Sequence, residues 1–176
     1  MADTPEGIVP PPAVDQKGNL TLWFVKTIAD VSAPKAATEI GAATSYRITY
    51  SLTADGYNLA GSQGTVKDER LTLAQPLESL DTNEVTLDLK YVDSAAAGSA
   101  AVVLAPVAPA TTVDGYIVER AGVPNATVAA AGQKVRVIPV TLGAQNPGPR
   151  DGQGKFTIVQ KAAITGVVSA PVALVA

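Results

Sequence analysis

The side chains that most often carry out catalysis are scarce in this chain of 176 residues. It contains no histidine and no cysteine, so it lacks an imidazole or thiolate that could act as general base, nucleophile or metal ligand. A serine nucleophile would need a lysine as its base, and Ser32 and Lys35 have a suitable spacing. Pro34 lies between them in a segment typical of a surface turn, and four-residue matches of this kind arise by chance. We therefore expect no catalytic dyad here.

Carboxylates are the remaining candidates for chemistry, and several lie close together in the sequence: Asp68 and Glu69, Glu78 and Asp81, Glu84 and Asp88. A glycosidase needs two carboxylates across a cleft and aromatic platforms for sugar rings, whereas only 5% of this chain is aromatic. The sequence has no clustered Asp run for calcium and no Gly-Lys-Ser/Thr loop for phosphate. A solvated acidic face is the better interpretation. We predict a protein that is not an enzyme, with no catalytic residue, metal or cofactor.

Composition limits the other function classes. Hydrophobic residues make up 47% of the chain, which is enough for one domain with a core, although alanine and valine supply much of this fraction. The net charge of −3 and the pI of about 4.9 disfavour tight binding of nucleic acid. The N-terminus does not have the pattern of a signal peptide, and no apolar run is long enough for a membrane span. We expect a soluble chain made in a cytoplasm, without a membrane anchor.

Alternation of polar and apolar residues predicts the elements that position these side chains. Residues 133–142 and 155–164 alternate on either side of a Gly/Pro/Asn-rich loop at 143–154, which predicts a long hairpin. The clearest strand is Glu84–Val92, where Val85, Leu87, Leu89 and Tyr91 should face one way and the polar residues the other.

Further strands are predicted at 20–25, 45–52, 65–74 and 112–121, with a loop at 54–64. Pro34 suggests one short helical turn, and the Ala-rich segment after Asp93-Ser94 predicts a helix that ends before Pro106. The fold class is therefore mainly β, a β-sandwich with one flanking α-helix and long loops and arms. We expect an extended Pro-rich arm at 1–18, a single domain at 19–166 and an uncharged arm at 167–176.

The order of these features resembles the major tail tube proteins of long, non-contractile-tailed (siphovirus-type) bacteriophages, especially those that infect actinobacteria. The resemblance rests on the residues from Ala29 to Ile40, the strand with Asp68-Glu-Arg70, and the Val85–Tyr91 strand followed by an Ala-rich helix. It continues through the hairpin from Gly132 to Val140 and ends at Gln160–Gly166, so it covers roughly residues 20 to 166. Where the family has Ala-Pro-Thr-x-x-Glu-Ile, this chain has Ala33-Pro-Lys-Ala-Ala-Thr-Glu-Ile40.

The resemblance implies a structural function. Such subunits assemble into hexameric rings, in which the inner sheets of neighbouring subunits join into one continuous barrel around a channel. Stacked rings form the tail tube that conducts the genome from capsid to host, and a long loop and terminal arms grip the next ring. Implied partners are further copies of the chain, the tape-measure protein, the tail tip and the tail terminator, while double-stranded DNA passes without specific binding. The implied location is the virion tail, after synthesis in the host cytoplasm.

Two sets of residues are candidates for these contacts. A channel that passes DNA should repel phosphate, so the acidic side chains Asp68, Glu84 and Asp88 are candidates for facing the lumen, although an ordinary solvated face explains them equally well. The predicted loops at 54–64 and 143–154 are long enough to suggest a role in contacts between rings. The inter-ring candidates on them are Asp55, Tyr57, Asn58, Asn146, Arg150 and Asp151.

Two other functions stay open. An immunoglobulin-like adhesion or carbohydrate-binding module on a virion surface would share the sandwich and the absence of catalytic residues. Monomeric behaviour together with glycan binding would favour it. A small enzyme that uses carboxylates alone would need a cleft and a glutamate with a raised pKa. The aromatic side chains fall mostly beside aliphatic residues on predicted strands, so core packing is the expected role for them.

Overall fold

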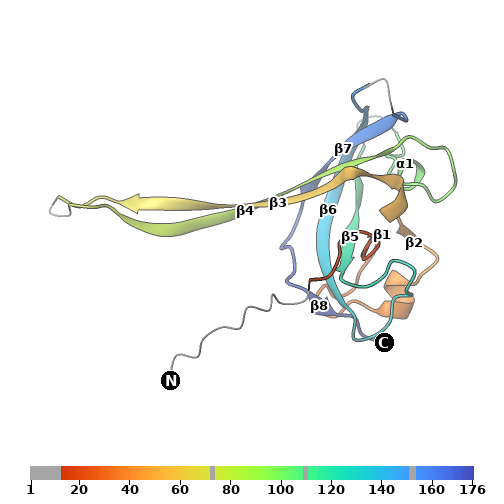
Figure 1. Ribbon diagram of the computed structural model, residues 1–176, viewed down its shortest axis with the longest axis horizontal. Helices are drawn as coiled ribbons and strands as arrows, with labels where there is room; N and C mark the ends of the chain where they lie inside the picture. The colour runs from red at the N-terminus through yellow and green to blue at the C-terminus, as the bar shows by residue number, and fades with distance from the viewer. Residues whose placement is uncertain (1–12, 72–73, 109–110, 151–153) are drawn as a thin grey trace.

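The computed structural model describes residues 13–71, 74–108, 111–150 and 154–176. It consists of a body built on a bent antiparallel sheet and a long two-stranded hairpin that projects from one side of that body (Figure 1). The mainly β class is confirmed. The strands of the main path form one continuous hydrogen-bonded sheet in the order β2-β1-β5-β6-β7-β4-β3, with β8 beside β6.

The bounds of the elements are, in chain order, β1 Leu20–Val25, η1 Ala36–Ile40, β2 Ser45–Arg47, η2 Thr49–Ser51, β3 Leu52–Asp68, β4 Leu77–Val92, α1 Ala100–Val103, β5 Val113–Ala121, β6 Lys134–Pro147, β7 Thr157–Ile164 and β8 Val172–Ala173. All strand pairs are antiparallel. The two edges of the main path are the short strand β2 and the long strand β3.

The sheet buries apolar side chains on both of its faces. On β1, Leu22 and Phe24 belong to one core cluster, while Trp23 and Val25 belong to the other. Since successive side chains of a strand point to opposite faces, the two clusters lie on opposite sides of the sheet. The first is covered by α1 and the second by η1 and the C-terminal segment around Leu174. This explains why the strand predicted at 20–25 is nearly continuous in apolar residues.

Strand β4 confirms the alternation predicted for residues 84–92. Leu87, Leu89 and Tyr91 are buried, whereas Glu84 and Asp88 are exposed. The strand also extends further than predicted, back to Leu77, because its outer half pairs with β3 beyond the body. Every described residue from Ala60 to Glu84 is exposed, so the outer part of the hairpin has no core of its own.

The loop predicted at 54–64 is wrong, because those residues belong to β3. Their glycines were interpreted as turn signals, but pairing with β4 overrides that local preference. Gly56 is required for a close approach, because a Cβ atom there would collide with the backbone oxygen of Lys90. The strand predicted at 45–52 is interrupted after Arg47 by the turn η2, and the strand predicted at 65–74 ends at Asp68.

The predicted helix before Pro106 is reduced to the single turn α1. Gly98 adopts a left-handed backbone conformation, with φ of +80°, and this stops the helix from including residues 95–98. The helical turn predicted near Pro34 is confirmed as η1.

The predicted hairpin of residues 133–164 is confirmed as the pair β6–β7. Its loop is shorter than the predicted 143–154, because β6 continues through a bulge to Pro147. The extra residue of a bulge allows Gly143 and its neighbours to remain in the strand despite their turn-like composition.

Residues 167–176, predicted to form an arm, lie against the body of their own chain. Leu174 is buried, and the backbone N–H of Val175 donates to the carbonyl oxygen of Pro34 at 3.0 Å. β8 pairs with the start of β6, which would otherwise have a free edge after β7 ends. Residues 1–12 of the predicted N-terminal arm lie outside the described residues. Contact of either arm with a neighbouring ring stays a prediction.

Candidate functional site

Among residues 13–71, 74–108, 111–150 and 154–176, no group of three or more Asp or Glu side chains could hold a metal ion. No helix in those ranges has the length and apolar character needed to cross a bilayer. The surfaces that remain as functional candidates are an exposed polar face of the sheet and the projecting hairpin.

The exposed polar face lies over β3, β4 and β7, opposite the core that contains Leu87 and Leu89. Asp88, a lumen candidate, pairs directly with Asn58 of β3 on one side and with Lys161 of β7 on the other. Side chains at directly opposite positions share a face, so these three lie side by side. The structure therefore brings an inter-ring candidate, Asn58, to the same place as a lumen candidate.

The other two lumen candidates are spread along the hairpin. Glu84 pairs with Ser62, four residues further out on β4 than Asp88. Asp68 lies at the far end of β3, where it forms an ion pair with Arg70 at 2.8 Å. At about 3.3 Å per residue, Asp68 is about 20 Å beyond Ser62. Asp88 and Glu84 thus lie on one face of β4, Asp88 at the body and Glu84 at the base of the hairpin, while Asp68 belongs to the hairpin tip.

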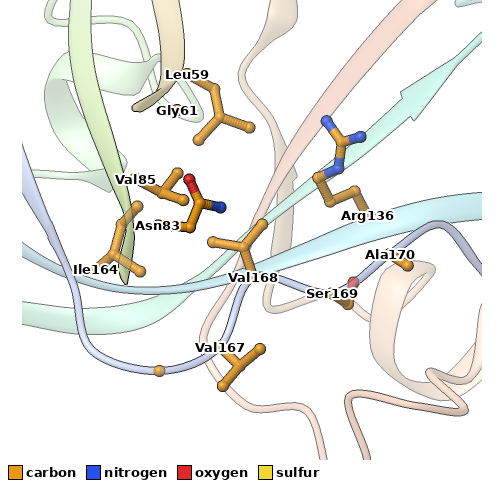
Figure 2. A pocket seen from close by; sticks show the side chains of 11 residues that line it. Leu59, Gly61, Asn83, Val85, Arg136, Ile164, Val167, Val168, Ser169 and Ala170 are labelled. Atoms are coloured by element: carbon orange, nitrogen blue, oxygen red, sulfur yellow. The ribbon is translucent and has the colours of Figure 1, made fainter. Parts of the chain in front are cut away.

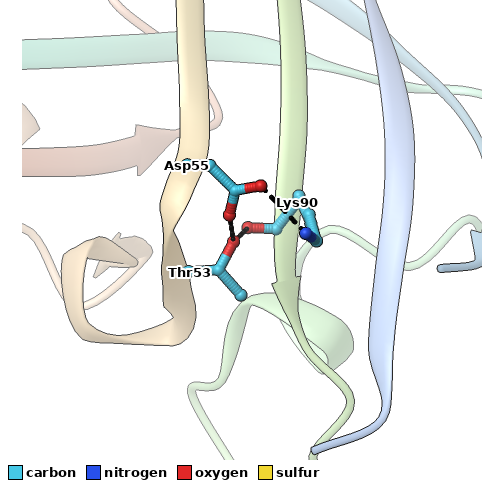
Figure 3. A network of polar contacts seen from close by, with 3 residues as sticks. All are labelled: Thr53, Asp55 and Lys90. Atoms are coloured by element: carbon cyan, nitrogen blue, oxygen red, sulfur yellow. Dashed lines mark hydrogen bonds and ion pairs between the residues drawn. The ribbon is translucent and has the colours of Figure 1, made fainter. Parts of the chain in front are cut away.

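Asp55, an inter-ring candidate, belongs to a small polar network between β3 and β4 (Figure 3). Its carboxylate accepts a hydrogen bond from the Thr53 hydroxyl at 2.8 Å and forms an ion pair with Lys90 at 2.9 Å. The hydrogen bond from Lys90, followed by that from Thr53, lowers the pKa of Asp55 to about 2. This carboxylate helps to hold β3 onto β4 where three extra residues bulge out of β3.

Tyr57, a second candidate from the same segment, points into the body rather than away from it. Its hydroxyl donates to Oε2 of Glu119 at 2.8 Å, and that carboxylate also contacts Arg136 at 3.4 Å. Burial raises the pKa of the Tyr57 phenol, and the neighbouring Glu119 charge raises it further. The phenol is therefore a neutral donor that ties β3 to β5 and β6.

The remaining inter-ring candidates lie around the β6–β7 turn. Asn146 is exposed on β6, and Arg150 lies over the ring of Phe156 at 5.7 Å, a cation–π distance. Asp151 lies outside the described residues. These side chains lie at the opposite end of β6 from β8, so they do not form one surface with the C-terminal segment.

A groove of about 910 Å³ separates the base of the hairpin from the C-terminal segment (Figure 2). Leu59 and Val85 line it from the hairpin, Ile164 and Val168 from the end of the chain, and Arg136 from β6. Val168 points into the centre of the groove in this view, and Val167 is 87% exposed. The apolar lining marks this region as a candidate contact surface.

Several functional candidates were missed from the sequence. Lys161 places a positive charge beside Asp88, so the exposed face is mixed in charge rather than uniformly acidic. Leu71 was predicted to lie in an ordinary strand at 65–74, and no element was predicted for Leu77 and Leu80, yet all three leucines are exposed on the hairpin. Most of residues 60–84 are polar or glycine, and this composition was the signal that no core covers the segment.

A protein-family model described as phage tail tube protein matches residues 9–176. No curated protein matches this sequence.

Proposed function

Because this chain belongs to the phage tail tube protein family, we propose that its copies close into hexameric rings that stack into a hollow channel for the genome. Membership of the family makes it a structural, β-rich protein of the phage virion that assembles into the tail tube. The finer elements of the proposal are the ring symmetry, the conduction of DNA from capsid to host, and the long non-contractile tail of siphovirus type. An adhesion or carbohydrate-binding function gains no support from the family.

The observation that carries the proposal is the projecting β3–β4 hairpin. Its described residues from Ala60 to Glu84 are all exposed, and Leu71, Leu77 and Leu80 among them are 57% or more exposed. A two-stranded ribbon without a core is marginally stable in water and leaves both strand edges and apolar side chains uncovered. Assembly with further copies would cover both, since a head-to-tail contact repeats around a closed ring.

The two edge strands of the sheet also support assembly into a ring, because neighbouring copies could pair with them. β2 and β3 end the strand order, so the outer hydrogen-bonding groups of β3 have no partner strand among the residues that the structure describes. Joining the sheets of neighbouring subunits would satisfy these groups and remove the edges.

The exposed polar face with Asp88, Glu84 and Lys161 is the surface we propose for the channel wall. Carboxylates repel the phosphates of passing DNA, and a lysine beside a carboxylate is less able to retain a phosphate than an isolated one. The tape-measure protein, tail tip and tail terminator are further proposed partners, and the host cytoplasm is the proposed site of synthesis before assembly.

Negative-stain electron microscopy of the purified protein across a concentration series tests the proposal. We expect rings or tubes of uniform width with a central channel. A matched control replaces Ser62–Glu84 by a two-residue Asn-Gly turn, which keeps the body strands and removes the outer hairpin. Monomers of the unmodified chain at every concentration, even with a tail-tip complex added as initiator, would contradict the proposal.

A further inference from the structure

A pocket of about 210 Å³ lies beside Trp23, on the face of the sheet that carries the second core cluster. Side chains from β1, β2, η1 and the loop between β5 and β6 line it, among them Trp23, Ser45, Arg47, Ile40 and Val128. Ser45 and Arg47 are two positions apart on β2, so they share a face, and Arg47 pairs directly with Trp23. The strand pairing therefore brings a hydroxyl group, a guanidinium group and an indole ring to one place.

The positive charge around Trp23 is not balanced by a carboxylate. Arg47 and Arg120 both lie over the indole ring, with their Cζ atoms 5.4 Å and 5.0 Å from its centroid. None of the ion pairs among the described residues includes either arginine. Burial lowers the pKa of Arg120, and the charge of Arg47 lowers it further. A negative group in the pocket would relieve this repulsion.

Arg47 has hydrogen-bond donors to spare. Its Nη1 donates to the carbonyl oxygen of Asn125 at 2.7 Å, and its Nη2 donates to that of Thr127 at 3.0 Å. A guanidinium group has five N–H donors, so three have no hydrogen-bond partner within the described ranges. The two bonds to the loop hold the group at the pocket and leave donors for a ligand.

Ser45 supplies a second unused group. Its hydroxyl oxygen is buried and has no hydrogen-bond partner among the residues that the structure describes. A buried hydroxyl without a partner costs free energy, so it marks a place where a ligand oxygen would be favourable. Rotation about the χ1 bond of the serine turns the hydroxyl without moving the backbone.

We propose that this pocket binds a small oxyanion, a phosphate or carboxylate group that accepts hydrogen bonds from the Arg47 guanidinium and the Ser45 hydroxyl. The planar fork of an arginine matches two oxygens of such a group. The bound anion balances the charge of the two arginines and so stabilises the loop at 122–133 that they hold. The inference goes beyond the proposed function, since the site belongs to the single subunit and needs neither ring nor tube.

Thermal unfolding of the full chain tests the site, in sodium phosphate and in sodium acetate against sodium chloride of the same ionic strength. Phosphate stabilises most proteins because it is excluded from their surface, so the informative quantity is the difference from Ser45→Ala. We expect the rise of Tm in phosphate to be about 3 °C larger for the unmodified chain, since losing a hydrogen bond to a charged group weakens binding about tenfold.

Two comparisons separate binding from a structural role of the serine. In chloride alone Ser45→Ala should be at least as stable as the unmodified chain, because it removes a buried hydroxyl without a partner. Ser79→Ala, a change of an exposed serine on the hairpin, should keep the whole rise of Tm in phosphate. Loss of stability by Ser45→Ala in chloride would contradict an unused hydroxyl.

The fluorescence of Trp23, the single tryptophan of the chain, supplies a readout at the pocket itself. Phosphate should change its emission in a saturable way, with a midpoint about tenfold higher in Arg47→Lys, which keeps the charge but loses the fork. Arg70→Lys, on the exposed hairpin, should leave the midpoint unchanged.

The two anions distinguish the ligand class. A saturable effect of phosphate alone supports a phosphate site, and an equal effect of acetate supports a carboxylate site. An equal rise of Tm for the unmodified chain and Ser45→Ala would show that phosphate acts only as a stabilising salt, and this would overturn the site. The same midpoint for the unmodified chain and Arg47→Lys would overturn it as well. Neither result bears on whether the copies assemble into tubes, which electron microscopy tests separately.

Discussion

Gln160 is a fully buried polar side chain whose amide is satisfied on every side. Its Nε2 donates to the carbonyl oxygens of Leu104 at 3.0 Å and Gly143 at 2.7 Å, and its Oε1 accepts from the Tyr91 hydroxyl at 2.7 Å. Gln145 in turn donates to the Tyr91 oxygen and to the Ala101 carbonyl. This network binds the single turn α1 to β4, β6 and β7.

Gln160→Leu should therefore destabilise the protein by about 1–3 kcal/mol, because it leaves buried carbonyls and a buried hydroxyl without partners. Urea denaturation measures the free energy of unfolding. The matched control, Gln16→Leu, changes an exposed glutamine and should stay within about 0.5 kcal/mol of the unmodified chain. Equal stability of the two variants would show that the network contributes nothing.

Asp55 gives a prediction about pH. Its pKa is lowered from 3.8 to about 2 by Lys90 and Thr53, so folding favours the charged form. The stability it contributes is present above pH 4 and is lost as the pH falls through 2. The difference in unfolding free energy between the unmodified chain and Asp55→Asn should therefore shrink between these pH values. A difference that stays constant from pH 6 to 2 would contradict this role for the carboxylate.

At the level of elements, the C-terminal segment completes the body where β7 ends. Leu174 is 2% exposed and packs with Val135 and Val137 in the second core cluster, while its backbone pairs with Gln133. A short terminal strand of this kind covers the free edge of β6 and closes the core beneath it.

Leu174→Ala should cost about 2–3 kcal/mol, toward the lower end of the range for buried leucines, because a chain end relaxes more easily around a cavity. Thermal unfolding followed by circular dichroism measures the loss. Val175→Ala, a change at the neighbouring and more exposed position, serves as the control and should cost less. If the two variants unfolded at the same temperature, the C-terminal segment would not be part of the core that unfolds cooperatively.

At the scale of the whole molecule, the chain consists of a folded body and the projecting β3–β4 hairpin, whose outer part has no core of its own. In the assembled tube we propose that Glu84 and Asp88 face the channel, so their charge should decide whether DNA is retained. Glu84→Lys combined with Asp88→Lys should make tubes that bind double-stranded DNA at low salt, because the added lysines neutralise phosphates. Unmodified tubes should not bind.

The control for this experiment keeps the same change in net charge. Asp15→Lys combined with Asp93→Lys places the lysines elsewhere on exposed positions of the chain. DNA binding is measured by co-sedimentation with assembled tubes. Equal binding by the two double variants would contradict the proposal that Glu84 and Asp88 face the channel.

The sequence by itself determined the mainly β class and most strand positions. It also showed that the chain has no histidine or cysteine side chain for catalysis or metal binding. The alternation of Val85, Leu87, Leu89 and Tyr91 was sufficient to predict the inner half of β4, because a half-buried strand follows a simple period of two. The resemblance to tail tube proteins agrees with the family that matches residues 9–176.

Only the tertiary structure decided the extent of the hairpin, the shortening of α1 and the partners of the candidate residues. Gly56, Gly61 and Gly64 look like turn residues, and only pairing with β4 makes them part of a strand. Arginine side chains are usually exposed, yet Arg120 is fully buried against the ring of Trp23. Its guanidinium group donates hydrogen bonds to the carbonyl oxygens of Pro124 and Thr127. Local preference reports what one segment favours alone, whereas contacts between distant segments decide which preference prevails.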